Sequence, residues 1–386
     1  MPHVFISAGE PSGDLHGANL ARALRECRPD MTVSGFGGER MAAAAVDLLY
    51  PMAQLAVMGF TRIPAHVLQF RRLLGLADRA FVERRPDAVV VIDYPGFHWH
   101  LARQARRRGI PVAYFVPPQL WAWAGWRVRK MRDRVNHVLC SLPFEVDWYR
   151  RRGVEAHYLG HPYFDELTRQ HLDPGFVAEQ SWRQGPVIGL LPGSRNQELD
   201  QNLATLLSAA GRIHAARPDA RFLVACFKPE HGRQVRAAVD RLRLPVEVHV
   251  GRTPEIIEVS RACVAVSGSV SLELLYRGTP SVVLYRTNRV AMLAARALVK
   301  CRYISLVNLL AGRELFPEFL SCRDESAGVA ARVLHWLDDP AAHDGVCREL
   351  KALRQEVAQP GACPQAARFL CERVLIAAAR EARRAG

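Results

Sequence analysis

The sequence has no apolar run of the roughly 18 to 20 residues that a helix needs to cross a bilayer. Its first residues have the pattern of a short strand and not of a signal peptide. The nine cysteines are scattered without a Cys-x-x-Cys pair, which is typical of reduced cysteines that pack inside a protein. No group of His, Cys and carboxylate residues has metal-ligand spacing. We therefore expect a cytoplasmic protein that uses neither a metal nor another cofactor.

Lysine is scarce, because only four of the 52 basic residues are lysines and the remainder are arginines. With 38 acidic residues, the formal net charge is +14. This balance favours anionic partners such as nucleotides, phosphorylated substrates, an acidic membrane surface or nucleic acid. No known nucleic-acid-binding motif accompanies the arginines, so we predict no nucleic-acid partner.

The length of 386 residues exceeds what one hydrophobic core usually supports, which favours two domains. Short apolar runs without alternation recur between helical segments in both halves of the chain, and they are typical of parallel strands buried on both faces. A polar stretch between residues 160 and 186 separates the halves. We expect one α/β domain over residues 1–165 and another over 186–345, with helices of 346–386 packing back on the first. The expected strands are residues 3–6, 32–35, 88–92, 112–116, 135–140, 187–191, 221–226, 247–250 and 263–266.

A turn suited to phosphate follows the expected strand 263–266. Ser267-Gly268-Ser269 connects this strand to a short helix in which Ser269 can serve as N-cap. Gly278 is suited to a left-handed stop of the helix, and Pro280 prevents its continuation. The helix start would present free backbone N–H groups to an anion. Glu273 follows by about one turn, where its carboxylate could accept hydrogen bonds from ribose hydroxyls.

A second turn of the same kind follows the expected strand 187–191. Here Gly193-Ser194-Arg195 places an arginine beside small residues, and guanidinium binds phosphate through two hydrogen bonds. Each turn alone is weak support, because such turns are mostly plain connections. Two of them in one α/β half, together with Arg195 and Glu273, indicate a site for a nucleotide diphosphate.

Further motifs extend over nearly the whole chain. They are Ser7-Ala8-Gly9-Glu10-Pro11-Ser12-Gly13-Asp14, Leu55-Ala56-Val57-Met58-Gly59-Phe60, Pro86-Asp87 with Ile92-Asp93, Leu120-Trp121-Ala122-Trp123, Leu142-Pro143-Phe144-Glu145, Gly160-His161-Pro162, Leu191-Pro192-Gly193-Ser194-Arg195, Ser267-Gly268-Ser269 with Glu273, and Tyr303 with Asn308-Leu309-Leu310-Ala311-Gly312-Arg313-Glu314. In these residues the chain resembles the lipid-A-disaccharide synthase family of GT-B glycosyltransferases. The resemblance implies two doubly wound, Rossmann-like domains that face each other across a cleft.

The resemblance also implies an inverting transfer of 2,3-diacylglucosamine from its UDP derivative to 2,3-diacylglucosamine 1-phosphate, called lipid X. The products are the β-1,6-linked lipid A disaccharide 1-phosphate and UDP. An inverting displacement needs a carboxylate to take the proton of the acceptor hydroxyl and positive groups to stabilise the leaving diphosphate. The turns at 193–195 and 267–269 are expected to hold the diphosphate, with Glu273 on the ribose.

Asp93, at the end of the strand 88–92, is the expected base, and Glu10 is the second candidate. Ser12 is expected at the substrate, although Ser12 and Asp14 could instead cap the helix that follows them. Asn308 is expected in the nucleotide region, with a helix-capping role as the alternative. The histidines at 16, 98 and 100 are expected to be structural.

The segment after Asp93 departs from the family. It reads Tyr94-Pro95-Gly96-Phe97-His98, where relatives often have Ala or Ser, then Pro-Asp-Phe-Asn. A second acidic residue and an amide are therefore missing. Acyl chain length and acceptor tolerance stay open.

A helix between residues 60 and 77 is a candidate for contact with the membrane that carries such substrates. Val67, Phe70, Leu73 and Leu74 fall at helical spacing, with arginines beside them. The alternative is an ordinary helix that packs on the core. On the first interpretation the protein associates peripherally with the inner membrane.

Two other functions compete with the lipid A transferase. A UDP-N-acetylglucosamine 2-epimerase, or another GT-B enzyme acting on a soluble UDP-sugar, would have the same fold without an apolar surface helix. An arginine-rich nucleic-acid binder would leave Glu273 and both phosphate turns without a purpose. The resemblance further suggests a homodimer.

Overall fold

The computed structural model describes residues 1–53, 63–266, 268–289, 292–293 and 298–376, with the side chains of 63–67 excepted. The motif at 55–60, Ser267 and the side chain of Val67 therefore lie outside the described residues. The chain divides into two compact units, residues 1–166 with 359–386 and residues 167–358. In the described part of the chain, no helix combines the length and the apolar character that crossing a membrane requires.

The first unit is built on a parallel sheet with the strand order β3-β2-β1-β4-β5-β6-β7. Its strands are β1 (His3–Ala8), β2 (Thr32–Phe36), β3 (Asp47–Tyr50), β4 (Ala88–Ile92), β5 (Val112–Phe115), β6 (His137–Cys140) and β7 (Ala156–Tyr158). The sheet grows in one direction from β1 to β3 and in the other from β4 to β7. This reversal of strand order makes the β1/β4 pair the topological switch point, where open α/β sheets bind their ligands.

Successive residues of the central strands face opposite sides of this sheet. Val4 and Ile6 of β1 belong to one core cluster, whereas Phe5 between them belongs to the other. The helices of this unit are α1 (Pro11–Cys27), α2 (Glu39–Ala43), α4 (Ile63–Arg84), α5 (Pro95–Arg107), α6 (Leu120–Trp123), α7 (Val128–Arg134), α8 (Pro143–Arg150), α9 (Pro162–Leu167) and α19 (Ala362–Phe369). Burial on both faces explains why these strands lack polar alternation.

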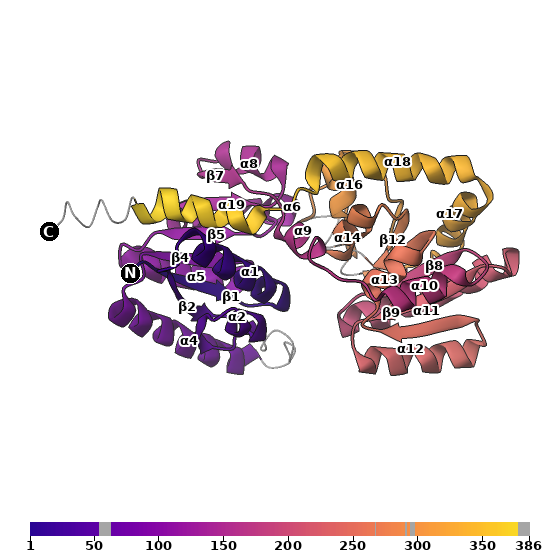
Figure 1. Ribbon diagram of the computed structural model, residues 1–386, viewed down its shortest axis with the longest axis horizontal. Helices are drawn as coiled ribbons and strands as arrows, with labels where there is room; N and C mark the ends of the chain where they lie inside the picture. Colours follow the sequence, from indigo (N-terminus) through magenta and orange to yellow (C-terminus); the bar gives the residue numbers. More distant parts are fainter. Residues whose placement is uncertain (54–62, 267, 290–291, 294–297, 377–386) are drawn as a thin grey trace. The chain divides into compact units, whose positions relative to one another are not determined.

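The C-terminal helix α19 packs against α1 in the first unit, as Figure 1 shows in yellow and indigo. Asp165 joins the two ends of this unit, because its buried carboxylate accepts hydrogen bonds from the backbone N–H groups of Gly361, Ala362 and Cys363. The preceding helix α18 (Pro340–Val357) packs against the second unit. The expectation that residues 346–386 all return to the first domain therefore places the boundary about a dozen residues too early.

The second unit has a parallel sheet in the order β10-β9-β8-β11-β12-β13. Its strands are β8 (Val187–Leu191), β9 (Arg221–Cys226), β10 (Val246–Val250), β11 (Ala262–Val266), β12 (Ser281–Arg286) and β13 (Glu318–Ser321). Its remaining helices are α10 (Pro174–Trp182), α11 (Asn196–Ala216), α12 (Pro229–Leu242), α13 (Thr253–Val259), α14 (Val270–Arg277), α16 (Leu306–Ala311) and α17 (Ser326–Asp338). Here the switch point is the β8/β11 pair. Both phosphate-type turns of the sequence follow these two strands.

We predict that Asp165→Ala destabilises the first unit by about 2–4 kcal/mol, because three backbone N–H groups at the start of α19 lose their acceptor. Denaturant unfolding followed by circular dichroism measures this loss. Asp147→Ala, at an exposed position of α8 in the same unit, is the matched control and should change stability by less than about 0.5 kcal/mol. Equal effects of the two substitutions would contradict the role assigned to Asp165.

Candidate functional site

The two candidate bases follow the two strands of the switch point in the first unit. Ala8 at the end of β1 pairs in register with Ile92 at the end of β4. Glu10 lies just after the first of these strands and Asp93 directly after the second. The fold thus brings to one place two carboxylates that are 83 positions apart in the sequence. A carboxylate at this edge is suited to accept a proton from a bound hydroxyl.

The backbone at Asp93 adopts a left-handed conformation that is unusual outside glycine. Asp93 has φ of 50° and Tyr94 has φ of 47°. Two hydrogen bonds reach the main-chain oxygen of Asp93, one from the Tyr114 hydroxyl at 2.6 Å and one from His98 Nδ1 at 2.6 Å. The turn that carries Asp93 is therefore tied to the interior of the unit.

Tyr94 covers the loop that carries Glu10. A Cβ atom on Gly9 would lie 2.3 Å from the Tyr94 ring, so the close approach of this ring requires glycine. Burial and the negative charge of Glu10 raise the pKa of the Tyr94 hydroxyl. The ring also lies 6.2 Å from that of Phe70, centroid to centroid, which links α4 to the turn at Asp93.

Ser12 and Asp14, both on α1, differ in their surroundings. Ser12 is exposed in the first turn. Asp14 is buried and accepts hydrogen bonds from the backbone N–H groups of Gly38, Arg40 and Met41. It therefore caps the start of α2, and the expectation that it could cap its own helix is wrong.

Glu145 is a titratable group of this edge to which the sequence analysis gave no role. Its carboxylate accepts hydrogen bonds from Trp121 Nε1 at 3.0 Å and from the Leu142 N–H at 3.1 Å. Burial nevertheless raises its pKa to about 7. Trp121 and Glu145 follow β5 and β6, so they share the carboxyl edge of the sheet with Asp93. The motifs around both residues were visible in the sequence, but their contact was not.

In the second unit, a carboxylate of the chain occupies the turn after β8. Glu198 Oε2 accepts hydrogen bonds from the backbone N–H groups of Ser194 at 3.0 Å and Arg195 at 3.2 Å. Gly193 has φ of 100°, and a Cβ there would collide with the Glu198 side chain. In this structure Glu198 therefore occupies the N–H groups that the expected diphosphate site at this turn would use. The Arg195 side chain is 73% exposed and lies 3.4 Å from Glu198 Oε1.

The turn after β11 leads into α14 with the expected boundaries. Ser269 is the N-cap residue, although its side chain makes no capping hydrogen bond, and Gly278 ends the helix with φ of 72°. Gly268 accepts a hydrogen bond from the Ser271 hydroxyl at 2.8 Å. Glu273 is buried and lies 3.3 Å from Arg277 Nε. A ribose at Glu273 would therefore share the carboxylate with this guanidinium.

Asn308 is wholly enclosed, and the expectation that it contacts a nucleotide is wrong for this conformation. Its side-chain amide donates to the main-chain oxygen of Phe316 at 2.7 Å and to Glu318 at 2.8 Å. Its oxygen accepts from the N–H groups of Leu315 and Phe316. Ser305, and not Asn308, caps α16. The Asn308 amide thus holds the segment before β13 against this helix. All four of its hydrogen bonds are made within the second unit.

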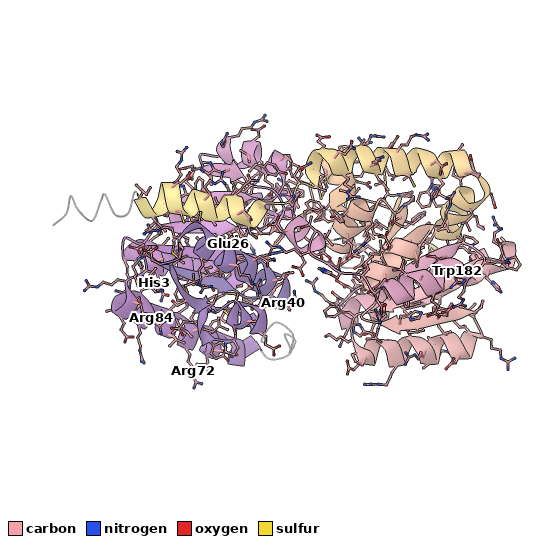
Figure 2. All side chains as sticks on the ribbon, in the orientation of Figure 1. His3, Glu26, Arg40, Arg72, Arg84 and Trp182 are labelled. Carbon is pink, nitrogen blue, oxygen red and sulfur yellow. The ribbon has the colours of Figure 1, made fainter. Side chains whose placement is uncertain are left out.

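The residues expected to touch a membrane lie on α4, but their described side chains mostly face the protein. Leu73 is 3% exposed within the core, and Phe70 and Leu74 are half-buried against it. For Leu73 the expectation is wrong, since a core residue cannot reach lipid. The exposed part of this helix carries Leu68, which is 60% exposed, and Arg72, labelled in Figure 2. These two residues line a hollow of about 710 Å³, together with Leu76 and Arg79.

One group in the described part of the chain could hold a metal ion. His137, Glu155 and His157 place three ligand atoms within 4.8 Å of one another. Glu155 Oε1 lies 3.0 Å from a ring nitrogen of each histidine. His137 and His157 lie on β6 and β7, and Glu155 directly precedes β7. His137 is the first residue of β6, whereas Asp93 follows the last residue of β4. The three groups already pair with one another.

Comparison with known proteins points to one family. The sequence model described as lipid-A-disaccharide synthetase matches residues 4–362. A curated lipid-A-disaccharide synthase from Myxococcus xanthus (strain DK1622) is 35% identical over 373 residues, which cover 96% of this chain and 97% of the relative.

Solved structures of lower sequence identity share the fold. A putative UDP-N-acetylglucosamine 2-epimerase from Listeria monocytogenes has a TM-score of 0.65 at 13% identity, covering 96% of this chain and 94% of its own. The glycosyltransferase of kitacinnamycin has a TM-score of 0.63 at 19% identity, covering 97% of this chain and 99% of its own. An epimerase and a transferase match equally well, so this likeness supports the GT-B fold and does not distinguish the two reactions.

We predict that Asn308→Ala lowers the stability of the second unit by about 2–4 kcal/mol, since two buried N–H groups lose their acceptor and a cavity forms. Affinity for UDP, measured by calorimetry well below the melting temperature, should stay within about twofold of the unchanged protein. Glu314→Ala, at an exposed position nearby, is the control. A large loss of UDP affinity in a variant of unchanged stability would instead show that Asn308 contacts the nucleotide directly.

Proposed function

The chain belongs to the lipid-A-disaccharide synthetase family, and we propose that it transfers 2,3-diacylglucosamine from its UDP derivative to 2,3-diacylglucosamine 1-phosphate. As a member of this family it is a glycosyltransferase that makes the lipid A disaccharide. In the proposed step, the 6-hydroxyl oxygen of the acceptor forms a bond to the anomeric carbon of the donor. The bond from this carbon to the phosphate oxygen breaks, and UDP leaves with the electron pair.

Asp93 is the proposed base that takes the proton of the attacking hydroxyl. The single observation that carries this role is its place at the switch point of the first unit, directly after Ile92, which pairs in register with Ala8 at the end of β1. Its side chain is partly exposed. Proton removal raises the nucleophilicity of the hydroxyl as the new bond forms. Glu10 and Ser12, on the neighbouring loop and helix, are proposed to bind the acceptor sugar.

The donor nucleotide is proposed to bind at the switch point of the second unit. Arg195 supplies a mostly exposed guanidinium for the diphosphate. The turns at 193–195 and 267–269 supply backbone N–H groups, and Glu273 supplies a carboxylate for the ribose. Because Glu198 accepts hydrogen bonds from two of these N–H groups, donor binding at the first turn requires this carboxylate to move.

The epimerase alternative shares the fold but lacks a family match of this extent. The sequence model covers residues 4–362 and the curated relative covers nearly the full chain, whereas the epimerase likeness rests on 13% identity. A soluble UDP-sugar as the true substrate would give turnover of UDP-N-acetylglucosamine without any acylated acceptor. The acylated pair is the proposal that agrees with the family.

Peripheral association with the inner membrane is proposed to involve α4, through its exposed residues instead of those first expected. Leu68 offers apolar surface, and Arg71 and Arg72 beside it are exposed cations suited to anionic lipid. The contact of Phe70 with Tyr94 connects the same helix to the turn of Asp93. An acyl chain that leaves the membrane along α4 would thus remain near the proposed base. A homodimer is the further partner that the family resemblance suggests.

We predict that Asp93→Asn lowers turnover by a factor of about 10² to 10⁴ and leaves UDP affinity unchanged, because the base and the nucleotide site belong to different units. Arg195→Ala should weaken UDP binding, with Arg233→Ala, another exposed arginine of the second unit, as the control. The measurements are UDP release from both acylated substrates in detergent and calorimetry with UDP. Near-normal turnover of Asp93→Asn would remove the base role and make Glu10 the next candidate.

We further predict that the double substitution Leu68→Ser with Arg72→Ser reduces binding to vesicles that contain anionic lipid, and reduces activity on substrate held in them. Activity in detergent should stay unchanged, because neither residue belongs to the proposed reaction site. Val82→Ser, which alters another exposed apolar residue of α4, is the control. Unchanged vesicle binding by the double variant would exclude this part of α4 as the membrane surface.

A further inference from the structure

We propose that Ser7, His98 and Tyr114 form a backbone clamp that positions Asp93 for proton transfer. This inference rests on the proposed function, in which Asp93 is the base. The three residues come from β1, α5 and β5. None of them needs to touch substrate, so each is a positioning residue that acts through the main chain of Asp93.

The turn needs such a clamp because its conformation is intrinsically unfavourable. Asp93 and Tyr94 are consecutive non-glycine residues with φ of 50° and 47°. A non-glycine residue in this conformation persists only where its surroundings hold it. Without contacts that hold it, the backbone at Asp93 would adopt a more favourable conformation, and the carboxylate would point in another direction.

The main-chain oxygen of Asp93 is held by two short hydrogen bonds. Tyr114, which is buried, donates its hydroxyl hydrogen at 2.6 Å, and His98 Nδ1 lies at 2.6 Å. A carbonyl oxygen has two acceptor positions, and both are used here. Two donors from different elements fix the orientation of this peptide group better than one could.

The protonation of His98 follows from its partners. A carbonyl oxygen can only accept, so Nδ1 must carry the hydrogen that lies toward Asp93. Burial lowers the pKa of His98 to about 4, which leaves the imidazole neutral and Nε2 without a hydrogen at neutral pH. Ser7 Oγ lies 2.9 Å from Nε2 and donates to it. The Asp93 carbonyl thus fixes the tautomer, and the serine hydroxyl satisfies the remaining ring nitrogen by donating to it.

His98 is the central residue of the clamp. The imidazole, 0% exposed, reaches from the serine of β1 to the turn after β4. The two strands of the switch point are thereby joined through one side chain, and β5 adds the second donor through Tyr114.

The test uses Tyr114→Phe and Ser7→Ala in the full chain, because each removes one hydroxyl and keeps the packing. We expect Tyr114→Phe to lower kcat about tenfold or more, with the KM for the UDP donor within about twofold, and Ser7→Ala to have a smaller effect of the same kind. His98→Leu should exceed both, and His98→Asn should recover part of the loss. His100→Asn, at an exposed position of the same helix, is the control and should leave kcat unchanged.

The decisive readout is a double-mutant cycle with Asp93→Asn. If the clamp acts through the Asp93 carboxylate, Tyr114→Phe should have almost no further effect on the residual turnover of Asp93→Asn. A kcat within twofold of the unchanged protein, or the same fold loss in both backgrounds, would overturn the clamp. High turnover of Asp93→Asn itself would instead remove the base role and the clamp together, so the two failures are distinguishable.

Discussion

Parallel strands that are buried on both faces can present polar groups only where they end, and the chemistry of this chain depends on that constraint. In the first unit, the buried side chains of β1 and β4 are mainly apolar, and Glu10 and Asp93 follow the ends of these strands. In the second unit, β8 and β11 lead in the same way to the turns of Arg195 and Ser269. Each pair of strands marks the place where the strand order reverses, so the connections diverge and leave room for a ligand. The sheets therefore determine which residues meet, long before any specific contact forms.

Most of the long apolar strands were predictable from the sequence, because they show little alternation. The short strands β3, β7 and β13 were missed, since three or four half-buried residues such as those of Glu318–Ser321 give no distinct pattern. The six-residue strand β12 was missed as well, although its first four residues are buried. The start of the helix α11 at Asn196 is not evident from the spacing of apolar residues. Its first turn is polar because Glu198 turns back to the preceding loop, and spacing alone does not reveal such a contact.

The sequence predicted the place of a residue where a motif met the end of a strand, as for Asp93 after β4. It misassigned residues whose role a distant partner decides. Asp14 caps a helix some 24 positions further on, and the Asn308 amide forms hydrogen bonds with the segment before β13. Leu73 has the spacing of a membrane-facing stripe, but α4 turns it into the core. A periodic pattern identifies one face of a helix and does not tell whether protein or lipid covers it. The exposed neighbour Leu68 is identified only once the fold is known.

The contact of Glu198 with the turn at Ser194 and Arg195 changes how anion binding at this turn must be understood. Backbone N–H groups at a helix start attract negative charge, and in this structure the chain supplies that charge itself. A diphosphate at this turn would exchange one anion for another, so its gain in free energy is the difference between two similar interactions. The net affinity must then come from contacts that a diphosphate makes and the carboxylate does not. The Arg195 guanidinium is mostly exposed and lies 3.4 Å from Glu198 Oε1, so a diphosphate that displaces this carboxylate would also take over its pairing with the guanidinium. A nucleotide diphosphate that contacts the guanidinium and the backbone N–H groups at the same time would be favoured over a smaller anion that contacts only one of them.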